Sequence, residues 1–323
     1  MSLLRAAAGL SSVVAALAVL QGSALVGQGD DPFAFLKPVV TVSPGDLQRL
    51  DRGEVIVRVL PAHDNQLAVF AVSRLDADPD SLIHWAGAIE QMKKSPYVLA
   101  IRRFSDPPLL SDLDGLMLDD EDVEDIPRCQ RGDCGVKLSE DEIVALKAAA
   151  DSGGAWKAAV QREFRRVLFN RVTRYRHAGL AGLPPYVDRP ETSLPRNAFG
   201  ALLEHSPHLR RHLPAMTDAL ARYPKTTLPS VDSFLDWSQE HYGRGKPVTT
   251  ITQVHVVRPG PPPLPAVLML AQEIFASHYR TGSLSTTAFV VGSADARYLV
   301  HLNRSQLDML KGMFGGVVRS VLE

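Results

Sequence analysis

The clearest alternation of apolar and polar positions lies in the last quarter of the chain. Val248–Val257 and Ser283–Val291 are rich in β-branched residues, which fit a pleated, half-buried surface. In Arg297–Arg304 apolar side chains recur at every second position, the period of a strand. We therefore predict a C-terminal sheet. Val267–Tyr279 adds a further strand to it, the interpretation we favour, although its composition also suits a helix.

The period then changes to that of a helix. Ser305 followed by Asp308 matches the capping-box pattern that starts helices. Beyond it, apolar residues recur on one helical face: Leu307, Leu310, Phe314, Val317 and Val321. We expect a long C-terminal helix that closes the sheet.

The N-terminal part predicts strands and one helix. Glu54–Leu60 and Leu67–Leu75 are strand-like runs separated by a short polar loop, which indicates a hairpin. A helix is expected from Asp80 or Ser81 to about Lys94, and Tyr97–Phe104 reads as another strand.

The middle of the chain is predicted to be helical. Ser139 with Glu142 forms a second capping box, opening a helical region that extends to about His177 with a break at Gly153-Gly154. Residues 180–230 are punctuated by prolines and suit short helices, and Val231–Tyr242 is predicted as a helix that leads into the terminal sheet.

Together these patterns predict an α+β fold: an antiparallel sheet closed by a long C-terminal helix, with a helical insertion in the middle of the chain. The predicted organisation is a signal peptide (1–24), an extended lead-in (25–45), an N-terminal β/α part of the sheet domain (46–110), a helical insertion (111–242), and a C-terminal sheet with its closing helix (243–323).

The first residues indicate export. Arg5 precedes an apolar run, Ala6–Leu20, and small residues at Gly22-Ser23-Ala24 suit a cleavage site. We expect a periplasmic or secreted protein, with an uncleaved anchor as the alternative. The formal net charge of −1 shows no basic excess, so nucleic-acid binding is not predicted.

The two cysteines, Cys129 and Cys134, are expected to form a local disulfide, because exported chains fold under oxidising conditions. A redox or metal role is the alternative. Their spacing does not match the two-residue spacing of thioredoxin-like motifs or of most zinc sites.

Three groups of charged or titratable residues in the middle of the chain are considered as further sites. Arg171 and Arg174 fall on or beside the apolar stripe of their helix, so they need a partner, either the acidic stretch 112–125 or an anionic ligand head group. We favour the internal pair. The acidic stretch does not match a calcium loop. His205, His208 and His212 lie close in sequence, but Pro207 and neighbouring arginines argue against a metal site. No metal or cofactor is predicted.

Two groups of motifs carry a resemblance. They are Gly132-Asp133-Cys134 with Val136-Lys137-Leu138, and Ala276-Ser277-His278-Tyr279 with Asn303-Arg304-Ser305, Asp308 and Phe314-Gly315-Gly316. Over most of the chain after the signal they resemble a family of uncharacterised exported bacterial proteins, which implies a cellular setting without an activity.

The order of elements also resembles the helix-grip fold of START-type lipid-binding domains. That resemblance implies a terminal helix lying across a curved sheet around an apolar cavity. The long stretch 112–242 departs from that pattern.

The leading functional hypothesis is therefore an exported binder or carrier of an apolar, lipid-like molecule. Candidate cavity aromatics are Phe275, Tyr279, Phe289, Tyr298 and Phe314, with Met313 beside them; the same residues also suit a plain core. His278, Arg280 and Arg304 are candidates for a polar end of the cavity.

Two alternatives stay open. An exported enzyme could use His255, His278 or His301 as acid-base, oriented by Glu273 or Asp308, although no nucleophile is indicated. A structural or assembly protein of the cell envelope, with a protein partner, is the third hypothesis.

Overall fold

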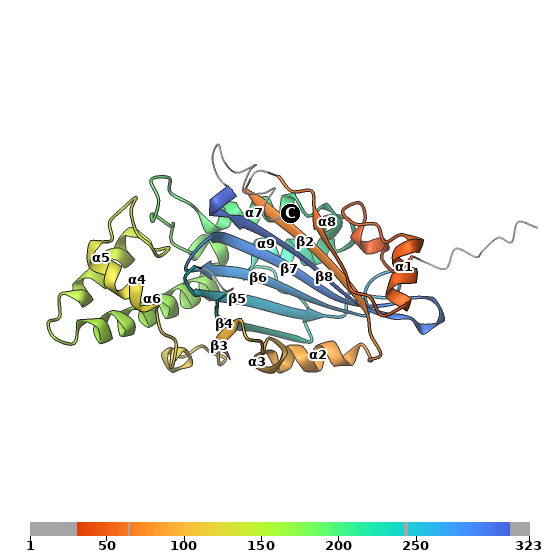
Figure 1. The fold of residues 1–323 in the computed structure, drawn as a ribbon, viewed down its shortest axis with the longest axis horizontal. Helices are drawn as coiled ribbons and strands as arrows, with labels where there is room; N and C mark the ends of the chain where they lie inside the picture. The colour runs from red at the N-terminus through yellow and green to blue at the C-terminus, as the bar shows by residue number, and fades with distance from the viewer. Residues whose placement is uncertain (1–30, 64, 242–244, 311–323) are drawn as a thin grey trace, which may run out of the picture.

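One antiparallel sheet organises the molecule (Figure 1). The computed structural model describes residues 31–63, 65–241 and 245–310. The strands lie in the order β1-β2-β8-β7-β6-β5-β4-β3, and every neighbouring pair is antiparallel. Their bounds are β1 Ile56–Leu60, β2 Gln66–Arg74, β3 Val98–Arg103, β4 Asp232–Glu240, β5 Val248–Val257, β6 Val267–Ala276, β7 Arg280–Val291 and β8 Arg297–Leu307.

In the described chain α1 precedes β1, α2 and α3 lie between β2 and β3, and α4 to α9 lie between β3 and β4. They are α1 Pro44–Asp51, α2 Asp80–Gly87, α3 Ile89–Met92, α4 Asp120–Asp125, α5 Glu140–Ala150, α6 Trp156–Ala178, α7 Pro195–Glu204, α8 Pro207–His212 and α9 Pro214–Arg222. The capping box at Ser139 starts α5 as predicted. Helices α7, α8 and α9 each begin at a proline, whose missing N–H is not needed in the first turn.

The sheet has two unlike faces. On the helical face, which packs against α6 to α9, two apolar cores form. One joins α7–α9 to β2, β6, β7 and β8, and the other joins α6 to β4, β5 and β6. In Figure 1 α7 to α9 lie behind the sheet, and α4 to α6 extend from one end of it.

The opposite side, which we term the cleft face, is covered at one end by α2 and α3. Leu82, Ala86 and Ile89 pack there against apolar side chains of β4 to β7. The rest of this face carries hydroxyl, amide and charged side chains. The same strands therefore serve a dry core on one side and a polar surface on the other.

Residues 231–242 are not the predicted helix. Within this range Asp232–Glu240 form β4, in which Leu235 and Trp237 enter the α6 core while Phe234 enters the α2–α3 core. Strand β4 contains no Val, Ile or Thr, so it lacks the β-branched residues that mark most of the other strands in the sequence.

The predicted start of a closing helix at Ser305 is also wrong. Strand β8 continues to Leu307, where Ser305 pairs with Ser283 of β7. Asp308–Leu310 is a single 3₁₀ turn, and Asp308 contacts Lys137 rather than capping a helix. The remainder of the predicted helix, including Met313 and Phe314, lies outside the described residues.

Other predictions are confirmed. The fold is α+β with an antiparallel sheet, Val267–Ala276 is a strand, and Cys129 and Cys134 form a disulfide. That disulfide is compatible with an exported protein. The predicted signal peptide, 1–24, lies outside the described residues. None of the helices in the described ranges is long and apolar enough to cross a bilayer.

Candidate functional site

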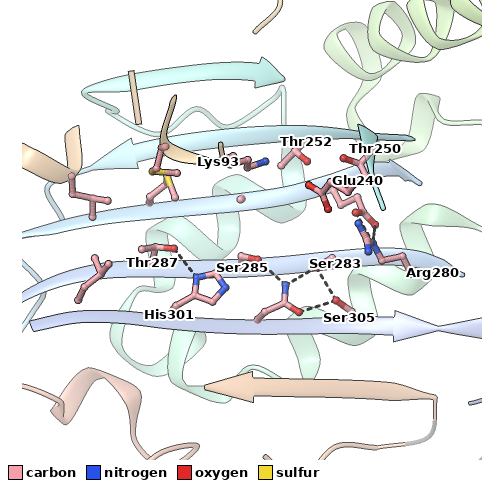
Figure 2. A pocket seen from close by; sticks show the side chains of 17 residues that line it. Lys93, Glu240, Thr250, Thr252, Arg280, Ser283, Ser285, Thr287, His301 and Ser305 are labelled. Carbon is pink, nitrogen blue, oxygen red and sulfur yellow. Dashed lines mark hydrogen bonds and ion pairs between the residues drawn. The ribbon is translucent and has the colours of Figure 1, made fainter. Parts of the chain in front are cut away.

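A cavity of about 580 Å³ opens on the cleft face over β4 to β8 (Figure 2). Alternate positions of neighbouring strands point to the same side, so their polar side chains gather into rows. The hydroxyl and amide groups that line the cavity are Thr250, Thr252, Ser283, Ser285, Thr287, Asn303 and Ser305.

The register of β7 and β8 organises these rows. Ser285 lies opposite Asn303, and the Asn303 amide donates to the hydroxyls of Ser285 at 2.7 Å and Ser283 at 2.8 Å. Ser305 donates to Ser283 at 2.9 Å. Mutual hydrogen bonds hold the groups in place, so they are preorganised for a polar ligand.

Charged groups close one end of this polar cavity. Arg280 donates through Nε to both carboxylate oxygens of Glu273, at 2.8 and 3.0 Å. Lys93 lies 3.4 Å from Asp236, and Ser238 donates to Glu240. Burial raises the pKa of both Asp236 and Glu273, and the neighbouring Glu240 carboxylate adds to the rise.

His301 lies on the same face, within hydrogen-bond distance of Thr287, with 2.9 Å between Nδ1 and Oγ1. Burial lowers the pKa of His301, so its imidazole is neutral at pH 7.

A second, apolar cavity of about 450 Å³ adjoins the polar one beside α2 and α3. Leu82, Met92 and Leu299 line both cavities, so the two cavities lie side by side on the same face. Phe289 and Trp85 complete the apolar end, where Trp85 is 46% exposed. We term the two cavities together the amphipathic cleft.

The cavity residues predicted from the sequence lie in different parts of the structure, some in the amphipathic cleft and some on the helical face of the sheet. Arg280 and Phe289 line the amphipathic cleft. On the helical face, Phe275 is buried in the α6 core, Tyr298 packs against Phe33 at 5.1 Å, and Arg304 is buried near Gln66. The predicted ligand set is therefore not gathered in one cavity, and a ligand-binding role for each residue stays a prediction.

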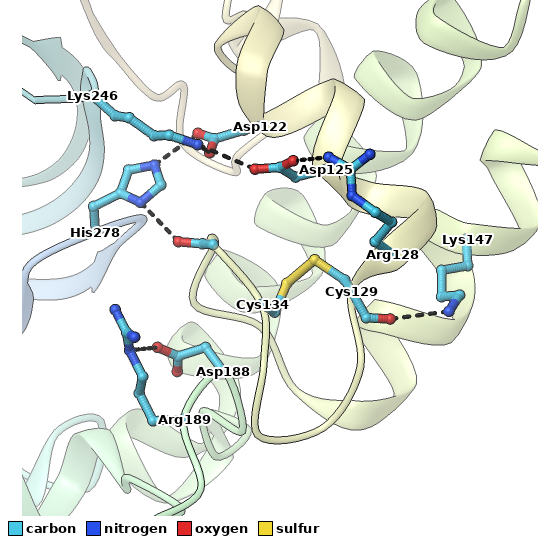
Figure 3. Close-up of a disulfide and its surroundings, with 11 residues drawn as sticks. Asp122, Asp125, Arg128, Cys129, Cys134, Lys147, Asp188, Arg189, Lys246 and His278 are labelled. Carbon is cyan, nitrogen blue, oxygen red and sulfur yellow. Dashed lines mark hydrogen bonds and ion pairs between the residues drawn. A yellow bond between two sulfur atoms is a disulfide. The ribbon is translucent and has the colours of Figure 1, made fainter.

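His278 and Tyr279 lie at the turn between β6 and β7. His278 lies beside the disulfide loop (Figure 3). His278 contacts the Asp122 carboxylate at 2.7 Å and the Gly135 carbonyl at 2.9 Å. Lys246 pairs with the same carboxylate at 2.6 Å, and its backbone N–H donates to the Tyr279 hydroxyl. These bonds tie the loop to the sheet.

Arg171 and Arg174 lie in different environments in the fold. Arg171 is fully buried, pairs with Glu142 at 2.5 Å and lies over the rings of Tyr186 and Phe275. Its partner is internal, as favoured, but it belongs to the start of α5 rather than to the acidic stretch. Arg174 is exposed.

The three clustered histidines face different partners. His205 contacts Gln66 and His212 contacts the Lys37 carbonyl, while His208 is buried. Within the described ranges, no group of three or more His, Cys, Asp or Glu side chains is arranged to hold a metal ion.

The sequence did not identify Lys93, Glu240 or the hydroxyl rows as site residues, and Asn303 entered only as part of a motif that carries a resemblance. One signal was present: Ser283, Ser285 and Thr287 occupy every second position of a strand. Hydroxyls at that spacing mark one polar face.

Comparisons with family models, curated proteins and solved structures found no match to this chain, so the resemblances stay predictions.

Proposed function

We propose that the protein binds an amphiphilic small molecule in the amphipathic cleft. The observation that carries this proposal is that an apolar and a polar cavity adjoin on one sheet face and share Leu82, Met92 and Leu299 as lining residues. Their volumes, about 580 and about 450 Å³, suit a small-molecule ligand.

The apolar end accepts the hydrocarbon part of the ligand. Phe289, Leu299 and Trp85 offer carbon surface there, of which Trp85 is 46% exposed. Covering such surface is favourable by about 25 cal/mol for each Å² removed from water.

The polar end accepts an uncharged, hydroxylated head group. Two carboxylates (Glu240 and Glu273) and two cations (Lys93 and Arg280) line this end of the cavity. Lys93 pairs with Asp236 and Arg280 pairs with Glu273, so both cations are already balanced by internal carboxylates, which disfavours an anionic head. The hydroxyl rows both donate and accept, as a sugar-like head group requires.

The lipid-like ligand and the exported setting belong to the same proposal. The Cys129–Cys134 disulfide supports folding in an oxidising compartment, where a carrier for a poorly soluble molecule has a use.

The experiment uses two detergents with the same alkyl chain, dodecyl maltoside and laurate, each titrated calorimetrically below its micelle concentration into the purified full chain. The maltoside is expected to bind more tightly. Leu299→Trp fills the apolar cavity and should weaken its binding about tenfold or more, a loss of about 1.4 kcal/mol or more.

Leu99→Trp is the matched control, because Leu99 is 58% exposed on β3 and does not line the cleft. Native and denaturing mass spectra of the untreated protein would reveal any retained passenger. Equal maltoside binding by the folded Leu299→Trp variant and the wild type would contradict the proposal.

A further inference from the structure

A third cavity, of about 580 Å³, lies where β3 and β4 meet Tyr223 and the last turn of α6. Its lining is polar and includes Ser233, Gln253, Tyr223, Arg103 and Arg176. Both arginines are held by ion pairs, Arg103 with Asp232 at 2.8 Å and Arg176 with Asp106 at 2.7 Å. This cavity is separate from the amphipathic cleft, with which it shares no lining residue.

Ser233 and His255 meet at this cavity. They are direct cross-strand partners in β4 and β5, so their side chains point to the same face. Ser233 Oγ lies 2.9 Å from His255 Nδ1. Ser233 is exposed, whereas His255 is 6% exposed and lies behind it.

Burial sets the protonation state of His255. Burial lowers the pKa of His255 to about 4, so the ring is neutral at pH 7 and one nitrogen can accept a proton. Its Nδ1 is the nitrogen that faces the serine hydroxyl.

Gln253 orients that hydroxyl. Its amide nitrogen contacts Ser233 Oγ at 3.1 Å and the main-chain carbonyl oxygens of Phe234 and Val254, at 3.0 and 3.2 Å. Contacts with two carbonyl oxygens identify this atom as the donor. An amide nitrogen has two protons for these three contacts, so Gln253 can donate one of them to Ser233 Oγ. With the His255 proton on Nε2, Ser233 Oγ then donates its own proton to His255 Nδ1.

We propose that Ser233 and His255 form a nucleophile and general base that transfer acyl groups from small esters entering this cavity. Ser233 Oγ attacks the ester carbonyl carbon and forms the new O–C bond, while its proton passes to His255 Nδ1. That proton then moves to the leaving alkoxide oxygen as the ester C–O bond breaks.

Water completes the cycle. His255 takes a proton from a water molecule that attacks the acyl carbon, and returns it to Ser233 Oγ as the acyl–serine bond breaks and the carboxylic acid leaves. Arg103 and Arg176 line the same cavity and are the cationic donors that it offers to the transient oxyanion.

Thr287 and His301 provide an internal comparison. Their Oγ1–Nδ1 distance is also 2.9 Å, and they too are cross-strand partners, but they lie in the polar cavity on the cleft face. Thr287 presents a more hindered secondary hydroxyl. A covalent probe should therefore distinguish Ser233 from Thr287.

The test treats the purified full chain with a small alkyl fluorophosphonate, followed by intact mass measurement and peptide mapping. One adduct is expected, on Ser233 and not on Thr287. Ser233→Ala should lose it. Ser152→Ala, a matched change of an exposed serine in the turn before α6, should label like the wild type.

His255→Asn should slow labelling about tenfold or more, because the serine then lacks its base. The decision does not depend on that variant folding, since wild type and Ser233→Ala differ only at an exposed hydroxyl. Absence of an adduct on Ser233, while a known serine hydrolase labels in parallel, overturns the proposal. Undiminished labelling of Ser233→Ala does the same. The detergent titrations report on the other face of the sheet, so either proposal can fail without the other.

Discussion

Leu284 and Ser285 are neighbours in β7, yet they face different surroundings. Leu284 is buried in the apolar core that α7 to α9 form with the helical face. Ser285 lines the polar cavity and accepts a hydrogen bond from Asn303. The same alternation runs through β5, β6 and β8, so one set of strands builds both a dry core and a polar cleft.

The difference between the two faces assigns them different roles: the helical face contributes mainly to stability, and the cleft face offers groups for binding. Burial of apolar area on the helical face is the main favourable contribution to folding. The hydroxyls of the cleft face satisfy one another and contribute little net free energy, but they stay available to a ligand. Substitutions on the two faces should therefore have different readouts.

The largest effect is expected from Arg171→Met, in the α6 core under the helical face. The change leaves the Glu142 carboxylate without its partner, and loss of one member of a buried pair costs about 3–5 kcal/mol. Urea unfolding measures the loss. Adding Glu142→Gln should restore part of the stability, whereas an additive double variant would show that the pair is not coupled.

Leu284→Ala and Ser285→Ala test the comparison on adjacent residues. Leu284→Ala should lower the free energy of unfolding by about 2–5 kcal/mol through cavity formation. Ser285→Ala should lower it by about 0.5–1.5 kcal/mol, the value of one hydrogen bond. Maltoside titration of both variants completes the test. Comparable losses of stability would mean that the cleft face is as important for folding as the core.

Replacing both Cys129 and Cys134 by serine should cost about 2 kcal/mol, as expected for a very short loop. Both cysteines lie in the α6 core, and the loop reaches the sheet through the bond between Gly135 and His278. Thermal unfolding with and without reductant measures the effect. Maltoside binding at a temperature where the variant is folded should stay unchanged; weaker binding there would show that the loop shapes the cleft.

The lowered pKa of His255 predicts that the free energy of unfolding depends on pH. Burial lowers the pKa of His255 from 6.5 to about 4, so above pH 6.5 the ring is neutral in both the folded and the unfolded chain. Between these values the unfolded chain binds a proton that the folded chain does not. Stability is therefore lost as pH falls, at about 1.4 kcal/mol per pH unit well inside the window.

Urea unfolding at pH 7 and pH 5 checks this expectation. His255→Gln should show a smaller loss between the two values than the wild type. His177→Gln, at an exposed position of α6, serves as the control and should match the wild type. A wild-type slope in His255→Gln would mean that other groups carry the acid sensitivity.

Local patterns predicted much of the fold. The strands β1, β2, β3, β5 and β7 follow from runs of strand-forming residues, β8 follows from alternation, and the start of α5 follows from the Ser139 capping box. Each of these signals is confined to a few adjacent residues. The pairing of Cys129 with Cys134 follows for the same reason: they are close in sequence. Strand β4 was missed because it contains no β-branched residue, the composition signal that marked most of the other strands.

The candidate sites, unlike the strands, combine residues that are far apart in the sequence. His255 was a candidate from its place on a strand, but its hydroxyl partner Ser233 comes from the residues predicted as a helix. Lys93 and Asp236 are far apart in the chain and meet only because α3 packs beside β4.

The sequence by itself determined that an antiparallel α+β sheet forms, where most of its strands lie and that the two cysteines pair, since these properties depend on neighbouring residues. Tertiary structure alone decided which face of each strand meets the helices, which hydroxyl meets which histidine and where the cavities open. Strand register and helix packing bring distant residues together, and no local period encodes those choices.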